Sequence, residues 1–90
     1  MPDIQTIHHT NIPFHWQYQP VKKEFSHPDG GTYFSYGLQV YRCQNQLREP
    51  VAYIDDISVC QNFVEDLALR FTVHQLSPVH LYDSVIDALP

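Results

Sequence analysis

The hydrophobic period of this chain changes near Ser58, and this change constrains the fold more than any other feature. Ahead of it, apolar and polar residues alternate, which is typical of half-buried strands. Beyond it, apolar residues recur every three or four positions, which is typical of amphipathic helices. A chain of 90 residues has room for one small domain. The sequence therefore predicts an α+β domain with its strands first and its helices second.

Three segments in the first part of the chain have the pattern of strands: residues 14–26, 32–43 and 50–57. Residues 27–31, His-Pro-Asp-Gly-Gly, are the strongest turn signal, because proline presets a turn and glycine accepts positive φ. Pro20 cannot donate a ladder hydrogen bond, so it either ends the first strand or marks an edge or a bulge. Because the connections are short, we expect a three-stranded antiparallel meander.

Two helices are expected after the strands. Ser58 and Gln61 have the spacing of a capping box for the first, and Ser77 and Pro78 are typical of the start of the second. The apolar stripe of the first helix consists of Cys60, Phe63, Val64, Leu67, Ala68 and Phe71, and that of the second consists of Leu81, Tyr82, Val85, Ile86 and Leu89. Each stripe must be buried on a surface, so we expect both helices on one face of the sheet.

Aromatic residues exceed what so small a core needs. In the central strand, Tyr33 and Tyr41 belong to the face opposite Leu38 and Val40. Because two helices cover one face only, the tyrosine face is either open to a partner or covered by residues 1–13. We expect those residues to form a loose N-terminal arm ahead of a domain of residues 14–90.

The net charge of −5 is confined to one part of the chain. Basic and acidic residues balance over residues 1–54, so the whole imbalance falls in residues 55–90. Nucleic-acid binders cluster Lys and Arg, and the only adjacent basic pair is Lys22–Lys23, so we expect no nucleic-acid partner. No apolar run is long enough to span a bilayer, so we expect no membrane association. The acidic part is either a binding surface for a basic partner or a solvated helix face.

Two cysteines, Cys43 and Cys60, have neither redox-motif nor zinc-site spacing. The first residues of the chain lack the pattern of a secretory signal peptide. We therefore expect free thiols in a cytoplasmic protein. Cys60 lies on an apolar stripe and is expected to be buried, whereas Cys43 is expected to be more exposed.

Three short segments resemble a known family. They are Tyr-Gly-Leu at residues 36–38, Ile-Asp-Asp-Ile-Ser at residues 54–58 and Leu-Ser-Pro-Val-His-Leu at residues 76–81. The family is one of short bacterial proteins of low-GC Gram-positive anaerobes, catalogued as a domain of unknown function. The resemblance covers about residues 32–89 and implies a fold and a bacterial cytosolic setting, but no activity.

Six histidines are the outlier in composition. His8, His9 and His15 lie close together in sequence, and neutral imidazole is a common ligand of zinc, copper and nickel. Three or four ligands must converge on a metal, which would require an ordered arm. The sequence thus leaves a metal-binding protein as the alternative function, and we expect no other cofactor.

Ser77, His80 and Asp83 have the residue types of a hydrolase triad. Two features argue against catalysis. Ser77 is needed as a helix cap, and the chain lacks the glycine-rich elbow that exposes a nucleophilic serine. We therefore expect no enzyme, with His80 in the first turn of the second helix and Asp83 in solvent.

The interpretation that follows is a non-catalytic protein-interaction or regulatory module, which binds another protein or a second copy of itself. Aromatic residues are enriched at such interfaces because they contribute a large contact area at a low entropic cost. The candidate interaction residues are Trp16, Tyr18, Tyr33, Tyr41, Tyr53, His80 and Asp83.

Overall fold

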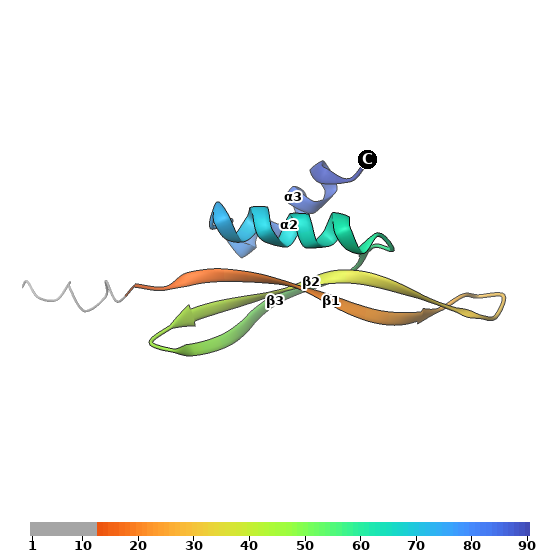
Figure 1. The fold of residues 1–90 in the computed structure, drawn as a ribbon, viewed down its shortest axis with the longest axis horizontal. Helices are drawn as coiled ribbons and strands as arrows, with labels where there is room; N and C mark the ends of the chain where they lie inside the picture. Colours follow the sequence, from red (N-terminus) through yellow and green to blue (C-terminus); the bar gives the residue numbers. More distant parts are fainter. Residues whose placement is uncertain (1–12) are drawn as a thin grey trace, which may run out of the picture.

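The structure is a computed structural model and describes residues 13–90. It confirms the predicted α+β architecture: a three-stranded antiparallel sheet in the order β1-β2-β3, followed by helices on one side of it (Figure 1). The elements are β1 (His15–Ser26), β2 (Thr32–Gln44), β3 (Leu47–Ser58), α2 (Gln61–Val73), the 3-10 helix η2 (Pro78–His80) and α3 (Leu81–Ala88). The predicted N-terminal arm falls almost wholly outside the described residues.

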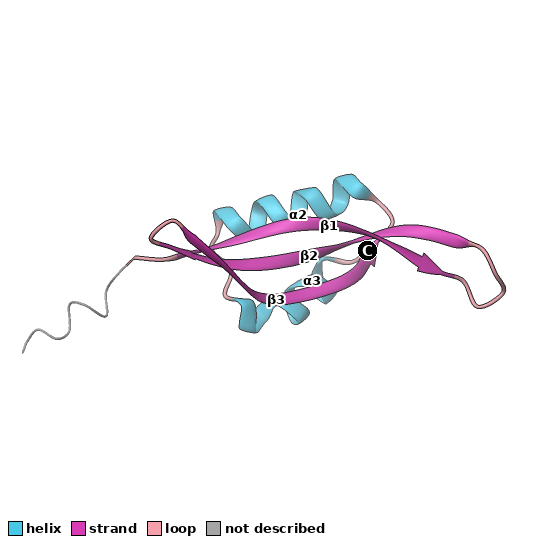
Figure 2. Ribbon diagram, turned by 90° about the horizontal axis from the view of Figure 1, so that it is seen from below, coloured by secondary structure: helices cyan, strands magenta, loops and turns pink. Residues whose placement is uncertain are grey.

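The core lies between the sheet and the two helices. Figure 2 shows that α2 runs along the β1 side of the sheet and α3 lies on the β3 side. The buried apolar residues come from both layers: Tyr18, Leu38, Val40, Val64, Leu67, Ala68, Leu81 and Val85. Both helices therefore bury a stripe on the same face of the sheet, as the alternation in β2 predicts.

Both hairpins follow from local turn chemistry. The first closes with a hydrogen bond from the N–H of His27 to the carbonyl of Gly31 at 3.0 Å, and Gly31 has a φ of 81°. In the second, Asn45 and Gln46 both have positive φ, which suits the twist of a two-residue hairpin loop. Because this loop is so short, β3 begins at Leu47 and not at residue 50 as the sequence predicted.

A bulge in β3 passes over β2 at Gly37. Leu38 pairs with Ile54 and Tyr36 with Ser58, so β3 has two residues more than its partner here. A Cβ on Gly37 would overlap the carbonyl oxygen of Ile54 and lie 2.6 Å from the Cα of Asp55. Gly37 is therefore the residue that lets the bulge approach so closely. The bulge also joins two of the segments on which the family resemblance rests.

The helix starts differ from the predictions. α2 has Cys60 at its N-cap, and the Ser58 hydroxyl instead accepts the N–H of Cys60 at 3.0 Å, so the capping box is not formed. Because Cys60 precedes the helix, it is exposed, and the prediction that it is buried is wrong. Ser77 starts η2 and makes no side-chain cap. Over residues 13–90, no helix has the length and apolar character needed to cross a membrane.

Candidate functional site

Two of the predicted interaction residues belong to the core side of the sheet, and for Tyr18, which is buried, the prediction of an exposed interaction residue is wrong. Tyr18 pairs with Val40 and is only 4% exposed, because alternate residues of β1 share the face that the helices cover. Its hydroxyl donates to the carbonyl oxygen of Leu76 at 2.6 Å, and burial raises the pKa of Tyr18 to about 12. Trp16 is half-buried against the same core and makes an edge-to-face contact with Phe14.

The other three tyrosines lie on the face of the sheet away from the helices. Within residues 13–90, no helix covers this face, and the β3 bulge crosses it at Gly37. Tyr33 stacks on Phe25, with ring centroids 5.6 Å apart, and its hydroxyl donates to the Asp56 carboxylate at 3.3 Å. Tyr53 is 43% exposed and makes no such contact in the described part of the chain.

Tyr41 is held by an arginine on the same face. The guanidinium carbon of Arg48 lies 4.0 Å from the centre of the Tyr41 ring. The Arg48 Nη1 atom also donates to the side-chain oxygens of Gln17 and Gln19, each at 3.3 Å. Tyr41 and Arg48 are thus already engaged within the sheet, and a partner would have to compete with those contacts.

His80 and Asp83 lie at the start of α3, and both are exposed. The backbone N–H of His80 donates to the carbonyl of Ser77 at 2.9 Å. Of the hydrogen bonds formed between described residues, none joins the side chains of Ser77, His80 and Asp83. The three residues are neighbours along one turn and do not form the relay that a triad requires.

The sequence prediction for the apolar stripe of α3 is only half right. Leu81 and Val85 are buried, whereas Tyr82 is 66% and Ile86 is 48% exposed. Each exposed residue follows a buried one, and one residue turns the helix by about 100°, which moves its side chain off the sheet. The sequence contained a sign that part of this stripe would be exposed, since five apolar positions cover more of the helix surface than one contact with a sheet can bury.

The exposed apolar residues next to the core side of α3 form a row, which we name the α3 ridge. It consists of Val79, Tyr82, Ile86 and Leu89, which are 78%, 66%, 48% and 36% exposed. Val79 lies in η2, Tyr82 and Ile86 lie in α3 and Leu89 is the C-cap of α3, and their spacings of three, four and three residues are those of neighbours on one side of a helix. Asp83 and Asp87 are exposed beside this row. The ridge was not among the predicted interaction residues.

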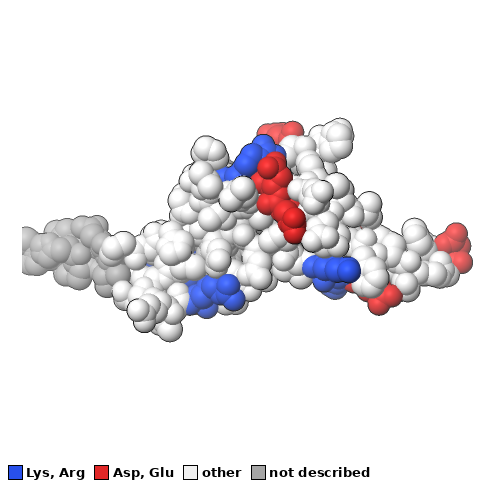
Figure 3. Space-filling view, in the orientation of Figure 1, with Lys and Arg blue, Asp and Glu red and all other residues white. Residues whose placement is uncertain are grey.

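The helix layer carries mostly acidic side chains, whereas the sheet carries both signs. In Figure 3, acidic side chains lie over the helices and also at one end of the sheet, and most of the basic side chains in view lie along the sheet. Asp66 of α2 is paired with Arg70 at 3.0 Å, and Asp55 of β3 is paired with Lys23 at 3.6 Å. No ion pair formed by the described residues involves an acidic residue of α3.

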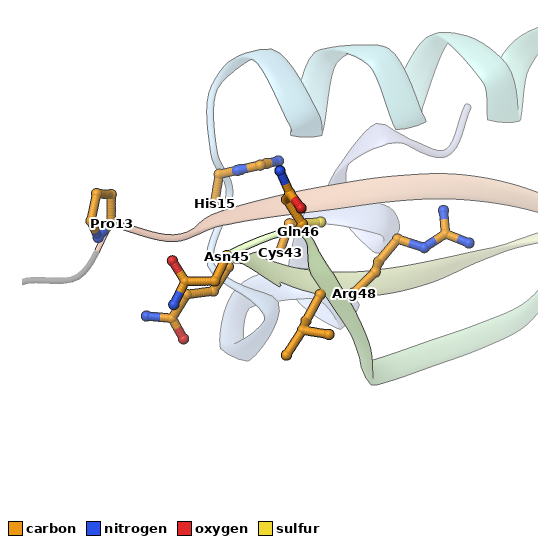
Figure 4. Close-up of a pocket in the computed structure, with 8 residues that line it drawn as sticks. Pro13, His15, Cys43, Asn45, Gln46 and Arg48 are labelled. Atoms are coloured by element: carbon orange, nitrogen blue, oxygen red, sulfur yellow. The ribbon is translucent and has the colours of Figure 1, made fainter.

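The predicted metal ligands are only partly within the described residues. His15 is exposed at the start of β1 and lines a shallow depression of about 440 Å³ beside the β2–β3 turn (Figure 4). Cys43 and Arg48 line it as well. His8 and His9 lie outside the described residues, and residues 13–90 contain no cluster of three or more His, Cys, Asp or Glu side chains suited to a metal.

The comparison with known families gives one match. The model of a family of unknown function, DUF6514, matches residues 3–89. This match is longer than the resemblance seen in residues 32–89, and it includes most of the expected N-terminal arm. No curated protein and no solved structure matches the chain. Because the family model spans nearly the whole sequence, the chain belongs to the family of unknown function DUF6514.

Proposed function

We propose that this chain is a non-catalytic protein-interaction module that binds another protein through the α3 ridge. One observation carries the proposal: four apolar side chains at helical spacing are exposed between η2 and the C-cap of α3. Scattered exposed apolar residues are ordinary, but a contiguous row beside charged residues is typical of an interaction site. The sequence indicates no enzymatic activity, and binding through the ridge requires none.

The ridge is suited to binding because two buried residues of α3 anchor it to the core. Leu81 and Val85, on the neighbouring side of α3, are 5% and 2% exposed and belong to the core cluster. A surface fixed by buried neighbours loses little conformational entropy when a partner docks on it. Tyr82 also brings an aromatic ring and a hydroxyl, a combination that is enriched at interfaces.

The uncovered sheet face is the second candidate surface. Tyr53, which pairs with Gln39, is 43% exposed there. The ridge is preferred because Tyr33 and Tyr41 already make contacts within the sheet, whereas Tyr82 makes no hydrogen bond or ring contact with any residue from 13 to 90. A side chain without internal contacts contributes more binding free energy when an interface forms, because no internal contact is lost.

The proposed setting is the bacterial cytoplasm. Cys43 and Cys60 are free thiols, which a reducing compartment preserves. In that setting the module would act by binding to the surface of a partner protein, and the effect of binding would depend on which protein that is.

Photo-crosslinking in the cells that produce the chain tests the proposal. A benzophenone amino acid is placed at Tyr82 and, as the control, at Leu47, which is 73% exposed in the β2–β3 hairpin. We expect a discrete adduct from position 82 that is absent from position 47 and is lost in an Ile86→Ser background. The captured protein, once purified, should bind the wild-type chain in calorimetry. Equal labelling from both positions, or an adduct that Ile86→Ser does not affect, would contradict the proposal.

A further inference from the structure

We infer that the segment bound by the α3 ridge is an amphipathic helix with Lys or Arg residues along the margin of its apolar side. This inference rests on the proposed function and names the chemistry of the partner. Its starting point is a second row of side chains on α3. Asp83 and Asp87 each follow a ridge residue by one position, so they form an acidic row about 100° further round the helix.

The shape of the ridge fits a helix. From Val79 to Leu89 it covers roughly 15 Å, which is about three helical turns. The spacings of three and four residues between its members are those by which one helix packs its ridges into the grooves of another. A partner with apolar residues at the same spacing would meet the whole length of the ridge, as in other helix-binding surfaces.

The charge of this surface selects a basic partner. Asp83 and Asp87 are exposed, and after Arg70 the chain contains no Lys or Arg. The acidic row therefore has no Lys or Arg neighbour along its own helix. Lys or Arg on a partner helix would supply the missing countercharge, which increases both the association rate and the specificity for that partner.

A second copy of the chain fits the ridge less well. If α3 of one copy packed on α3 of another, Asp83 and Asp87 would face the same residues of the other copy or flank them closely. Like charges placed together at an interface are unfavourable. The same row would be repelled by an anionic membrane surface, since helices that lie on membranes carry Lys and Arg on their polar face.

Three synthetic peptides of 18 residues test the inference by calorimetry with the full chain. The first has leucine at helical spacing and lysine elsewhere. The second replaces every lysine with glutamate, and the third keeps the lysines but replaces every leucine with serine. The chain is used as wild type, as Asp83→Asn with Asp87→Asn, and as Glu24→Gln with Asp29→Asn. The last variant is the matched control, because it removes two charges from the β1–β2 hairpin, far from the helices.

We expect the leucine–lysine peptide to bind most tightly. Its affinity should fall about fivefold in the α3 double variant, as expected for two exposed ion pairs, and should stay unchanged in the hairpin variant. Higher salt should reduce wild-type binding more than binding to the α3 double variant. Circular dichroism checks that each variant keeps its helical signal.

Other results overturn the inference. If the glutamate peptide bound as tightly as the leucine–lysine peptide, the ridge would not select charge, and the proposed function would stand. If the serine peptide bound as tightly as the leucine–lysine peptide, the apolar row would contribute nothing to binding. A dimer in light scattering that Ile86→Ser dissociates would identify a second copy as the occupant, and binding to phosphatidylserine vesicles would identify a membrane. Absence of binding by all three peptides would reject a basic helix, while the crosslinking test would still decide whether the ridge binds another protein.

Discussion

The side-chain amide of Gln75 pairs with the backbone of Trp16 as a neighbouring strand would. Its Nε2 donates to the Trp16 carbonyl at 2.8 Å, and its Oε1 accepts the Trp16 N–H at 2.7 Å. Two residues along β1, the Thr72 hydroxyl accepts the N–H of Tyr18 at 3.0 Å. Alternate residues of a strand direct their backbone groups to the same edge, so Pro20 belongs to this edge too. Proline has no N–H, and Pro20 therefore leaves no unpaired donor there. Thr72 of α2 and Gln75 just beyond it therefore satisfy the outer edge of β1 at Trp16 and Tyr18, where unpaired backbone groups would otherwise be a template for aggregation.

Replacing Gln75 should loosen the attachment of α2 to β1. The Gln75 side chain makes three hydrogen bonds to backbone groups, because its Nε2 also donates to the Thr72 carbonyl at 2.6 Å. We expect Gln75→Ala to lower the free energy of unfolding by about 3 kcal/mol, at roughly 1 kcal/mol for each backbone hydrogen bond lost. Gln75→Glu keeps the acceptor for the Trp16 N–H but loses both donated bonds, so its loss should be about two thirds as large. Urea denaturation measures both. An equal loss in the two variants would show that the paired hydrogen bonds do not hold this edge.

Gly37 should not tolerate a side chain. Gly37→Ala would force the Cβ against the Ile54 carbonyl oxygen, which is backbone and can yield only if the bulge moves. We expect a loss of about 3 kcal/mol in the free energy of unfolding, measured by urea denaturation.

Ser35→Ala is the matched control for Gly37→Ala, because Ser35 lies two residues away on the same face and is also fully buried. Its hydroxyl is without a hydrogen-bond partner in the described part of the chain. Removing an unpaired buried hydroxyl should leave stability unchanged or raise it by up to about 1 kcal/mol. If both variants destabilised the chain equally, general sensitivity of β2 would explain the result, and the close approach of the bulge would not.

Tyr18 should make stability fall in strong alkali. Burial raises its pKa from 10.0 to about 12, so the folded state favours the neutral phenol. The contribution of Tyr18 is therefore complete below pH 10 and is lost as the pH rises from 10 towards 12. Tyr18→Phe should cost about 1 kcal/mol at pH 8, since the Leu76 carbonyl loses its donor. At pH 11 the difference from wild type should be smaller. A difference that is constant with pH would contradict the buried hydroxyl.

Two adjacent apolar residues of α3 should differ in how much their substitution destabilises the chain. Val85 is 2% exposed in the core, and Val85→Ala should lower the free energy of unfolding by about 2 kcal/mol. Ile86 is 48% exposed, and Ile86→Ser should change it by less than about 0.5 kcal/mol. Thermal and urea denaturation compare the two. A large loss of stability in Ile86→Ser would mean that Ile86 is structural and that the ridge is not a free surface.

The fold could be predicted because its signals are local. The change of period near Ser58, the glycines after Asp29 and the alternation around Leu38 each act within a few residues. What the sequence did not predict depends on distant contacts. Nothing near Gly37 indicates that β3 will cross it, and the spacing of Ser58 and Gln61 cannot show that a turn will use the serine before the helix begins.

The candidate site was predicted less well, for a geometric reason. Alternation in β1 places Tyr18 and Trp16 on one face, but only the register with Val40 shows that this is the covered face. On α3, the sequence contains more apolar residues than one contact can bury, yet only packing separates Val85 from Ile86. The acidic residues were recognised from composition alone, and their position beside the ridge required the helix to be placed on the sheet.

Nuclear magnetic resonance of the 15N-labelled chain tests the central claim most directly. The leucine–lysine peptide is titrated in, and the shift of each backbone amide is followed. We predict that the largest changes map to residues 79–89 and are lost in Ile86→Ser, while the amides of Tyr41, Arg48 and Tyr53 stay unchanged. If the largest changes instead map to those three sheet residues, the uncovered sheet face is the binding surface and the α3 ridge is not.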